Sequence, residues 1–207
     1  MKKIEGKSIY DEVDDFWNGF AAVKRNDKWG FVNEKGEEIV PCKYDEVWDF
    51  SEGFAKVKLD GKCGFVNKQG EEVIRCKYDD VGRFSEGFAA VELDGKWGFL
   101  NKQGEEVILC KYDNVGRFLK GFAVVELDGK WGFVNKQDEE VVPCEYDEVR
   151  AFSEGFAAVG LDDKWGFVNE QGEEVVPCKY DYLGVFSEGF VEVERNGKRG
   201  SVGQKVG

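Results

Sequence analysis

The feature that most constrains this chain is a repeat of 34 residues, which runs along it without insertion or deletion. A tyrosine, a lysine and a glycine mark the register by recurring at that spacing in all six repeats. They are Tyr10, Tyr44, Tyr78, Tyr112, Tyr146 and Tyr180; Lys28, Lys62, Lys96, Lys130, Lys164 and Lys198; and Gly30, Gly64, Gly98, Gly132, Gly166 and Gly200. Such a period indicates similar units that bury their apolar faces against their neighbours.

The repeats fill the whole sequence. They start near Gly19, Gly53, Gly87, Gly121, Gly155 and Gly189, and residues 1–18 make an N-terminal partial unit. We therefore predict a single repeat domain over residues 1–207, which leaves no room for a separate catalytic domain.

The pattern inside each repeat indicates strands. Helical tetratricopeptide repeats also have a period of about 34 residues, so the local alternation must decide between helix and strand. In residues 87–120, Ala89, Val91 and Leu93 lie two residues apart and Glu92 separates the last two. This period of two is typical of a strand with one buried face. We expect no helix.

Turn signals divide the same repeat into three strands. Asp94-Gly95 is a strong hairpin signal, because both residues tolerate the positive φ of a tight turn. Residues 96–101 then form the return strand, residues 102–104 turn the chain again, and residues 105–110 form the third strand. Each repeat is predicted to be a three-stranded β-meander.

Exceptions to the repeat agree with this division. Where a turn glycine is missing, an aspartate replaces it, and aspartate also accepts the left-handed region: Asp27, Asp138 and Asp163. Three prolines share one position, predicted at the end of the third strand, where a missing N–H is tolerated: Pro41, Pro143 and Pro177. The link that follows, with the pattern YDxVxxFSEG, is expected to fold as a tight turn packed by its Tyr, Val and Phe.

The predicted fold class is therefore all-β, with six tandem 34-residue three-stranded meanders. We expect an open, curved, solenoid-like array, because the polar Arg199 and Ser201 suit a terminal cap. The alternative is a closed, six-bladed, propeller-like ring, in which KKIEGKSI, residues 2–9, completes the last unit. Its match to the third-strand sequence EEVVPCK is poor.

Charge and hydropathy exclude several classes of partner. The formal net charge of −13 opposes binding to nucleic acid or to an anionic membrane surface. No stretch is apolar enough for a membrane helix, and the N-terminal MKKIEGKSIY lacks the apolar segment of a leader. We expect a cytoplasmic protein.

The cysteines follow the repeat and do not read as a disulfide framework. Five of the six occupy one position per repeat, and Cys63 is the exception: Cys42, Cys76, Cys110, Cys144 and Cys178. Each is interpreted as a small buried apolar residue in a reducing compartment. Zinc would require four such ligands close together, so we expect no metal site.

Catalytic signals are missing from the sequence. There is no histidine, which removes the commonest general base, and the acidic residues recur in every repeat as a solvated face would. The Asp-Gly turns at Asp60, Asp94 and Asp128 were considered as calcium ligands, but each offers one carboxylate where calcium takes six or more oxygens. We expect no enzyme activity, no cofactor and no metal.

Three segments together resemble a known family. The core GKWGF, the preceding FSEGFA and the following VVPCKYD resemble the WG, or KWG, β-repeat family of bacterial proteins over essentially the whole chain. The resemblance implies an all-β array that acts as an interaction module and has no family-wide catalytic residues. Cys63 and Arg199 depart from it by standing at the tryptophan position, and Ser201 replaces the phenylalanine that follows.

The repeated tryptophans allow two interpretations. They are Trp29, Trp97, Trp131 and Trp165. An adjacent glycine lets a large indole or a neighbouring backbone approach closely, which favours packing. In the alternative, the indole rings form a shelf for a carbohydrate or another cell-envelope ligand.

Residues that break the repeat are the candidates for recognition, and most lie in the link. Large apolar groups replace small or polar ones there: Trp17, Trp48, Leu119, Tyr182 and Val185. Three arginines lie in the same link and are typical hot-spot residues: Arg83, Arg117 and Arg150. For Trp17 and Val185, which lie in the outer units, filling the ends of the array is an equal explanation.

The function predicted from these observations is a non-enzymatic protein–protein interaction scaffold built from WG repeats, with the links as its binding rim. Its partner is expected to be a protein with a basic or mixed surface. The alternative is the carbohydrate or cell-envelope module that uses the repeated tryptophans.

Overall fold

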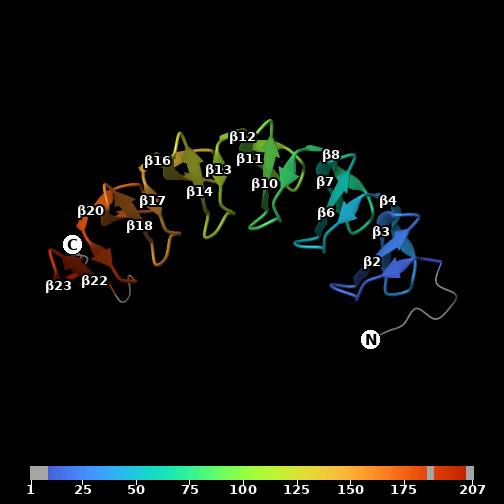
Figure 1. Cartoon of the computed structure of the whole chain (residues 1–207), viewed down its shortest axis with the longest axis horizontal. Helices are drawn as coiled ribbons and strands as arrows, with labels where there is room; N and C mark the ends of the chain where they lie inside the picture. Colours follow the sequence, from blue (N-terminus) through green and yellow to red (C-terminus); the bar gives the residue numbers. More distant parts are fainter. Residues whose placement is uncertain (1–8, 186–188, 204–207) are drawn as a thin grey trace. The chain divides into compact units, whose positions relative to one another are not determined.

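The computed structural model describes residues 9–185 and 189–203 (Figure 1). Residues 1–8 of the expected N-terminal partial unit, and with them all of KKIEGKSI except Ile9, lie outside the described residues. Within the described part every regular element is a β-strand. The chain forms two compact units, residues 1–110 and residues 111–207.

The first unit holds three sheets, whose strands follow one another in chain order. They are β1 (Glu12–Val13), β2 (Phe20–Arg25), β3 (Lys28–Asn33) and β4 (Glu38–Tyr44); β5 (Glu46–Val47), β6 (Phe54–Leu59), β7 (Lys62–Asn67) and β8 (Glu72–Tyr78); and β9 (Asp80–Val81), β10 (Phe88–Leu93), β11 (Lys96–Asn101) and β12 (Glu106–Tyr112), whose last two residues belong to the second unit.

The second unit repeats this order. Its strands are β13 (Asn114–Val115), β14 (Phe122–Leu127), β15 (Lys130–Asn135) and β16 (Glu140–Tyr146); β17 (Glu148–Val149), β18 (Phe156–Leu161), β19 (Lys164–Asn169) and β20 (Glu174–Tyr180); and β21 (Tyr182–Leu183), β22 (Phe190–Arg195) and β23 (Lys198–Gly203). In the described residues the last sheet has three strands, and each of the other sheets has four.

The predicted hairpin between the first two long strands is confirmed. Ala89 pairs with Leu100 and Glu92 pairs with Trp97 in the antiparallel register of β10 and β11. Ala89 and Val91 are fully buried, whereas Glu92 keeps part of its surface in water. The alternation in the sequence therefore reports which face of the strand packs in the core, and the all-β repeat fold is as predicted.

A short fourth strand in each complete sheet comes from the link. Glu46 and Val47 pair with Lys58 and Val57 of β6, so this part of the link extends the next sheet. Two backbone hydrogen bonds between Ser51 and the residue three further along close a tight turn just before β6. The link thus contains the predicted tight turn together with a strand that the pattern does not indicate.

Turn chemistry agrees with the sequence. The hairpin turn after β6 places Asp60 at φ 51° and Gly61 at φ 78°. Aspartates that replace turn glycines also have positive φ: Asp27 at 59°, Asp138 at 63° and Asp163 at 59°. These residue types tolerate the left-handed region, which fixes where each hairpin reverses.

The glycine of the Trp-Gly pair is required by a β-bulge in the third strand. A Cβ on Gly30 would lie 2.3 Å from the carbonyl oxygen of Val40, because the register shifts between Trp29 and Phe31. Pro41 follows Val40 inside β4, so the prediction that the prolines end the third strand was wrong. They are tolerated because the strand is bulged and lies at the sheet edge.

Phenylalanines of the link join neighbouring sheets within each unit. The ring centroid of Phe50 lies 4.6 Å from that of Phe20 and 4.9 Å from that of Phe31, both in the preceding sheet. The same arrangement recurs at Phe84, which contacts Phe54 and Phe65, and at Phe152, which contacts Phe122 and Phe133. These three links are therefore packed on the sheet before them while they pair with the sheet after them.

Candidate functional site

The repeated aspartate of the link is a structural residue. Asp45 accepts hydrogen bonds from the Lys28 ammonium at 2.5 Å and from the backbone N–H of Asp60 at 2.7 Å. These bonds, the lysine bond first, lower the pKa of the carboxyl below its usual value. Three further members of the repeat make the same pair of bonds: Asp79, Asp147 and Asp181. The carboxylates of these aspartates are therefore engaged in hydrogen bonds that hold the fold together.

The repeated tyrosine is bound in a similar way. Tyr44 donates a hydrogen bond to Glu72 at 3.2 Å, and Glu72 lies in the third strand of the next sheet. Equivalent bonds run from Tyr10 to Glu38, from Tyr78 to Glu106 and from Tyr112 to Glu140. Burial is the main cause that raises the pKa of these phenols, so they stay protonated at neutral pH.

The repeated cysteines are half-buried, and the prediction of full burial holds for Cys63 alone. Each of the five lies 3.5 to 3.8 Å from the carbonyl oxygen of the valine 19 residues earlier in its own sheet. Burial raises the pKa of Cys76, Cys144 and Cys178 to about 11. Burial therefore disfavours the reactive thiolate form of these cysteines at neutral pH.

The described residues contain neither a metal-binding cluster nor a membrane-spanning helix. No group of three or more His, Cys, Asp or Glu side chains is placed to hold a metal ion. No helix in this part of the chain is long and apolar enough to cross a membrane.

The repeated tryptophans are half-buried, which lies between the buried packing residue and the exposed ligand shelf that the sequence allows. Trp29 and Trp165 each pack against an apolar cluster that two consecutive sheets share. Cations also approach their rings, because the Arg150 guanidinium lies 4.6 Å from the Trp165 centroid and the Lys24 ammonium lies 5.6 Å from that of Trp29. A sugar ring stacking on those faces would have to displace the cation.

The candidate partner-binding residues are distributed over both units. Trp17, Trp48 and Arg83 lie in the first; Leu119, Tyr182, Val185, Arg117 and Arg150 lie in the second. Four of the apolar ones are exposed: Trp17 by 63%, Leu119 by 40%, Tyr182 by 54% and Val185 by 80%. The three arginines are also exposed, although Arg150 is stacked on Trp165.

Two of these candidates are brought together within the first unit. Trp48 and Arg83 line one hollow of about 310 Å³, together with Ser51, Lys56 and Phe65. We call it the Trp48 hollow. Its walls come from consecutive links and from the strands β6 and β7, so it joins residues that lie one repeat apart.

Lys56 is the residue of this hollow that the sequence pattern did not single out for binding. Its ammonium lies 4.4 Å from the centroid of the Trp48 ring and forms an ion pair with Asp80. Its side chain is only 15% exposed. The available signal was that a lysine replaces the small apolar Ala22 and Ala90 at this position of the first long strand.

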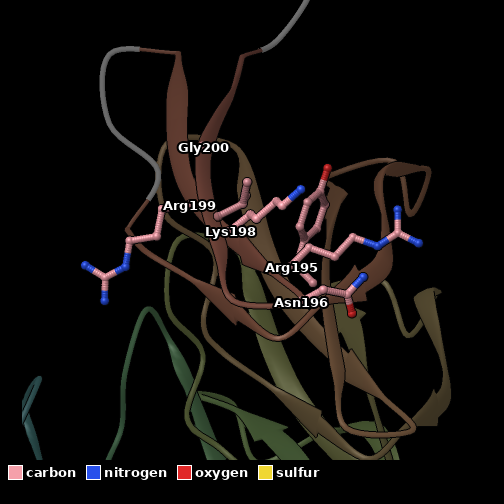
Figure 2. A pocket seen from close by; sticks show the side chains of 7 residues that line it. Arg195, Asn196, Lys198, Arg199 and Gly200 are labelled. Carbon is pink, nitrogen blue, oxygen red and sulfur yellow. The ribbon is translucent and has the colours of Figure 1, made fainter.

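A second hollow, of about 370 Å³, lies in the second unit at the last hairpin (Figure 2). We call it the β23 hollow; it is lined by Tyr180, Val193, Arg195, Lys198, Arg199 and Gly200, among others. Figure 2 shows Arg195 and Lys198 on one side of the hairpin and Arg199 on the other. The sequence predicts a terminal cap at Arg199 and Ser201, and it indicates no binding site here.

The fold and these sites define an all-β tandem-repeat protein. In each complete repeat the third strand has a bulge that packs against a glycine, because a side chain there would collide with it. The family model for the WG containing repeat matches residues 7–29, 29–63, 64–97, 97–131, 131–165 and 165–198. The chain belongs to this family, as the sequence predicts.

Comparisons with other proteins add little beyond the family. No curated protein matches the sequence. Among solved structures, Hsv2 of Kluyvelomyces marxianus is 14% identical, with a TM-score of 0.46 over 89% of this chain and 75% of that one. Hsv2p of Kluyveromyces lactis is 12% identical, with a TM-score of 0.43 over 88% and 71%. Because both TM-scores lie below 0.5, we assign no property of these proteins to this chain.

Proposed function

We propose that this protein is a non-enzymatic scaffold that binds another protein, and that the Trp48 hollow is a contact site. The observation that supports this most is the meeting of Trp48 and Arg83 from consecutive repeats in one hollow, because Trp48 stands where three other repeats have a glycine. Tryptophan and arginine are the residue types that dominate the energetics of protein interfaces.

The chemistry of the hollow suits a mixed surface. Lys56 already has its ion pair with Asp80, whereas the exposed Arg83 makes no ion pair with a described residue. A guanidinium in this state can bind a partner carboxylate with two parallel hydrogen bonds. The Trp48 and Phe65 side chains beside it offer apolar surface. We expect a partner that inserts an apolar side chain next to an acidic one.

The carbohydrate alternative has less support. It needs the repeated tryptophans to present a free ring face, and in Trp29 and Trp165 a cation lies over the ring. The repeated acidic residues, tyrosines and thiols have structural bonds, which favours binding over catalysis.

Two variants test the assignment to this hollow. Trp48→Gly introduces the residue that Gly82, Gly116 and Gly184 show to be compatible with the repeat, and it removes one wall of the hollow. Arg83→Ala removes the free guanidinium. Arg117→Ala is the matched control, because Arg117 stands one repeat further on and outside the hollow.

The measurement is the affinity of a purified partner, first captured from source-cell lysate on the wild-type protein. We expect Trp48→Gly and Arg83→Ala each to weaken binding at least about tenfold, and Arg117→Ala to leave it within about twofold. Equal binding by all the variants, or an equal loss of binding in the control, would show that the Trp48 hollow is not the contact site. Glycan binding that is lost in Trp97→Ala would support the alternative.

A further inference from the structure

The tight turn that ends a link can bind a carboxylate through two backbone N–H groups. In the first unit, the N–H groups of Glu86 and Gly87 donate hydrogen bonds to the two carboxylate oxygens of Glu52, at 2.9 and 3.1 Å. The Lys102 ammonium lies 3.1 Å from the same carboxylate. An acidic side chain of one link thus binds the turn of the next link, with a cation beside it.

The second unit contains the same turn. Two backbone hydrogen bonds between Ser153 and Phe156 close it, at 2.8 and 3.0 Å. Glu154 and Gly155 have φ values of 52° and 84°, close to the 51° and 90° of their counterparts in the first unit. Their N–H groups make no hydrogen bond to another residue of the described ranges, 9–185 and 189–203. Consecutive N–H groups in such a turn form a concave site for an anion.

The residue that would bind this turn from within the chain is a lysine. Lys120 stands two repeats after Glu52, at the same position, and its side chain is exposed. A residue at this position also reaches the next turn in the first repeat, where the Asn18 amide donates to the carbonyl oxygen of Phe50 at 3.3 Å. The repeat therefore places the ammonium of Lys120 beside the turn, where the first unit has a carboxylate.

The neighbouring residues indicate what would bind. Glu170 stands where Lys102 stands two repeats earlier, and it makes no ion pair with a residue in the described part of the chain. A charge-exchanged pair therefore does not replace the missing carboxylate. Leu119, next to Lys120, is apolar and 40% exposed. Two N–H donors, a cation and an apolar side chain together suit an acidic side chain that has an apolar neighbour.

We propose that the turn at Glu154 and Gly155 binds an acidic side chain of a partner protein. Its carboxylate takes the position that Glu52 has at the turn in the first unit. The two N–H groups bind its oxygens, Lys120 balances its charge, and Leu119 offers apolar surface to the adjacent partner residue. This site lies in the second unit and does not rest on the Trp48 hollow.

The chain supplies a probe with a single carboxylate. A capped peptide of residues 50–54, Phe-Ser-Glu-Gly-Phe, has the native sequence around Glu52. It is titrated into the full, ¹⁵N-labelled chain while the amide resonances of Gly155 and Gly87 are followed by NMR. We expect a saturable movement at Gly155 and none at Gly87, whose N–H already binds Glu52.

Two further ligands define what is recognised. A peptide with glutamine in place of its glutamate should bind at least about tenfold more weakly, because it lacks the carboxylate. Acetate should also bind at least about tenfold more weakly than the peptide, because it offers nothing to Leu119. Acetate that binds as well as the peptide would assign the turn to a small free acid and would overturn the proposal of a protein partner.

Lys120→Glu is the decisive variant, because it restores the carboxylate that the first unit has. We expect peptide affinity at Gly155 to fall at least about tenfold, while the midpoint of thermal unfolding stays the same or rises. Lys120→Gln removes only the charge and should weaken binding less. Glu170→Gln removes an opposing carboxylate and should tighten it.

Three results would overturn this proposal. They are the absence of peptide-induced movement at Gly155, equal affinity for the glutamine peptide, and unchanged peptide affinity in a folded Lys120→Glu variant. Trp48→Gly should bind the peptide as the wild type does. Failure of the Trp48 hollow as a contact site would therefore leave the result at this turn unaffected.

Discussion

The carboxylate of Asp79 lies 2.5 Å from the ammonium of Lys62 and accepts a second hydrogen bond, at 2.9 Å, from the backbone N–H of Asp94. The lysine opens β7, and the amide belongs to the hairpin turn of the next sheet. A single link residue therefore joins the turns of two consecutive repeats. The identical arrangement at Asp45 explains why the chain keeps this aspartate and this lysine at a constant spacing.

This contact predicts a loss of stability in acid. The lysine and backbone hydrogen bonds exist only in the folded chain and lower the pKa of four link carboxyls below the ordinary 3.8: Asp45, Asp79, Asp147 and Asp181. Their stabilising effect is complete above that value and is lost as the pH falls through the lower, folded pKa. Urea unfolding followed by circular dichroism between pH 6 and about pH 2 measures this.

Asp79→Asn provides the control for the acid prediction. The amide keeps the shape of the side chain but cannot titrate, so the variant should be less stable than the wild type at pH 6 and should lose less on acidification. A wild type and variant whose midpoints fall in parallel would contradict the assignment.

Alkaline pH is predicted to destabilise the fold as well. Burial raises the pKa of Cys144 from 9.0 to about 11 and that of Tyr146 from 10.0 to about 12. A group with a raised folded pKa stabilises fully below its unfolded pKa, and this contribution disappears as the pH rises through the folded value. Stability should therefore fall from about pH 9 upward, first through the thiols and then through the phenols.

Tyrosinate absorbance near 295 nm, recorded beside the circular dichroism signal, tests this sequence of events. The phenolate signal of the buried tyrosines should appear together with unfolding, and Cys144→Ser should weaken the early part of the decline. Titration of all seven tyrosines near pH 10 in a folded chain would contradict it.

The Trp-Gly glycine is predicted to be intolerant of any side chain. Gly132→Ala places a methyl group 2.4 Å from the carbonyl oxygen of Val142, and neither backbone can move without breaking the bulge. Overpacking of this kind costs about 1–3 kcal/mol. Gly200→Ala is the matched control and should change stability by less than about 0.5 kcal/mol, because its surroundings are open. Equal effects in thermal unfolding would contradict the bulge explanation.

The link phenylalanine is predicted to be the largest single contributor to packing between sheets. Phe84 is 4% exposed and its ring contacts those of Phe54 and Phe65, with centroid distances of 4.6 and 4.9 Å. Phe84→Ala should destabilise the protein by about 3–5 kcal/mol, as truncation of a buried ring does. Chemical unfolding measures this, and a loss below about 1 kcal/mol would show that the sheets are held mainly by other contacts.

Much of the fold could be predicted, because it depends on local sequence patterns that recur in every repeat. Alternation gives the buried face of each strand, and Asp60-Gly61 or Asp27 at positive φ gives each hairpin. The bulge could not be predicted, since Gly30 and Val40 lie ten positions apart and their contact depends on a register shift. The placement of Pro41 was wrong for the same reason. The preference for an open array remains a prediction.

The candidate site was predicted in part. Trp48 was predicted as a departure from the repeat and Arg83 as a hot-spot residue type in the link, and both line one hollow. Lys56 was missed as a binding residue because a charge on an alternating strand is typical of a solvated face, whereas its ammonium lies over the Trp48 ring and its side chain is only 15% exposed.

The most direct test of the central claim, that the departures from the repeat carry recognition, is amide hydrogen exchange on the protein with and without its captured partner. The account predicts added protection in residues 48–56 and 80–84, around the Trp48 hollow. Protection confined to the repeated strands β11, β15 and β19, which carry Trp97, Trp131 and Trp165, would contradict it and would favour a ligand shelf built from the repeated tryptophans.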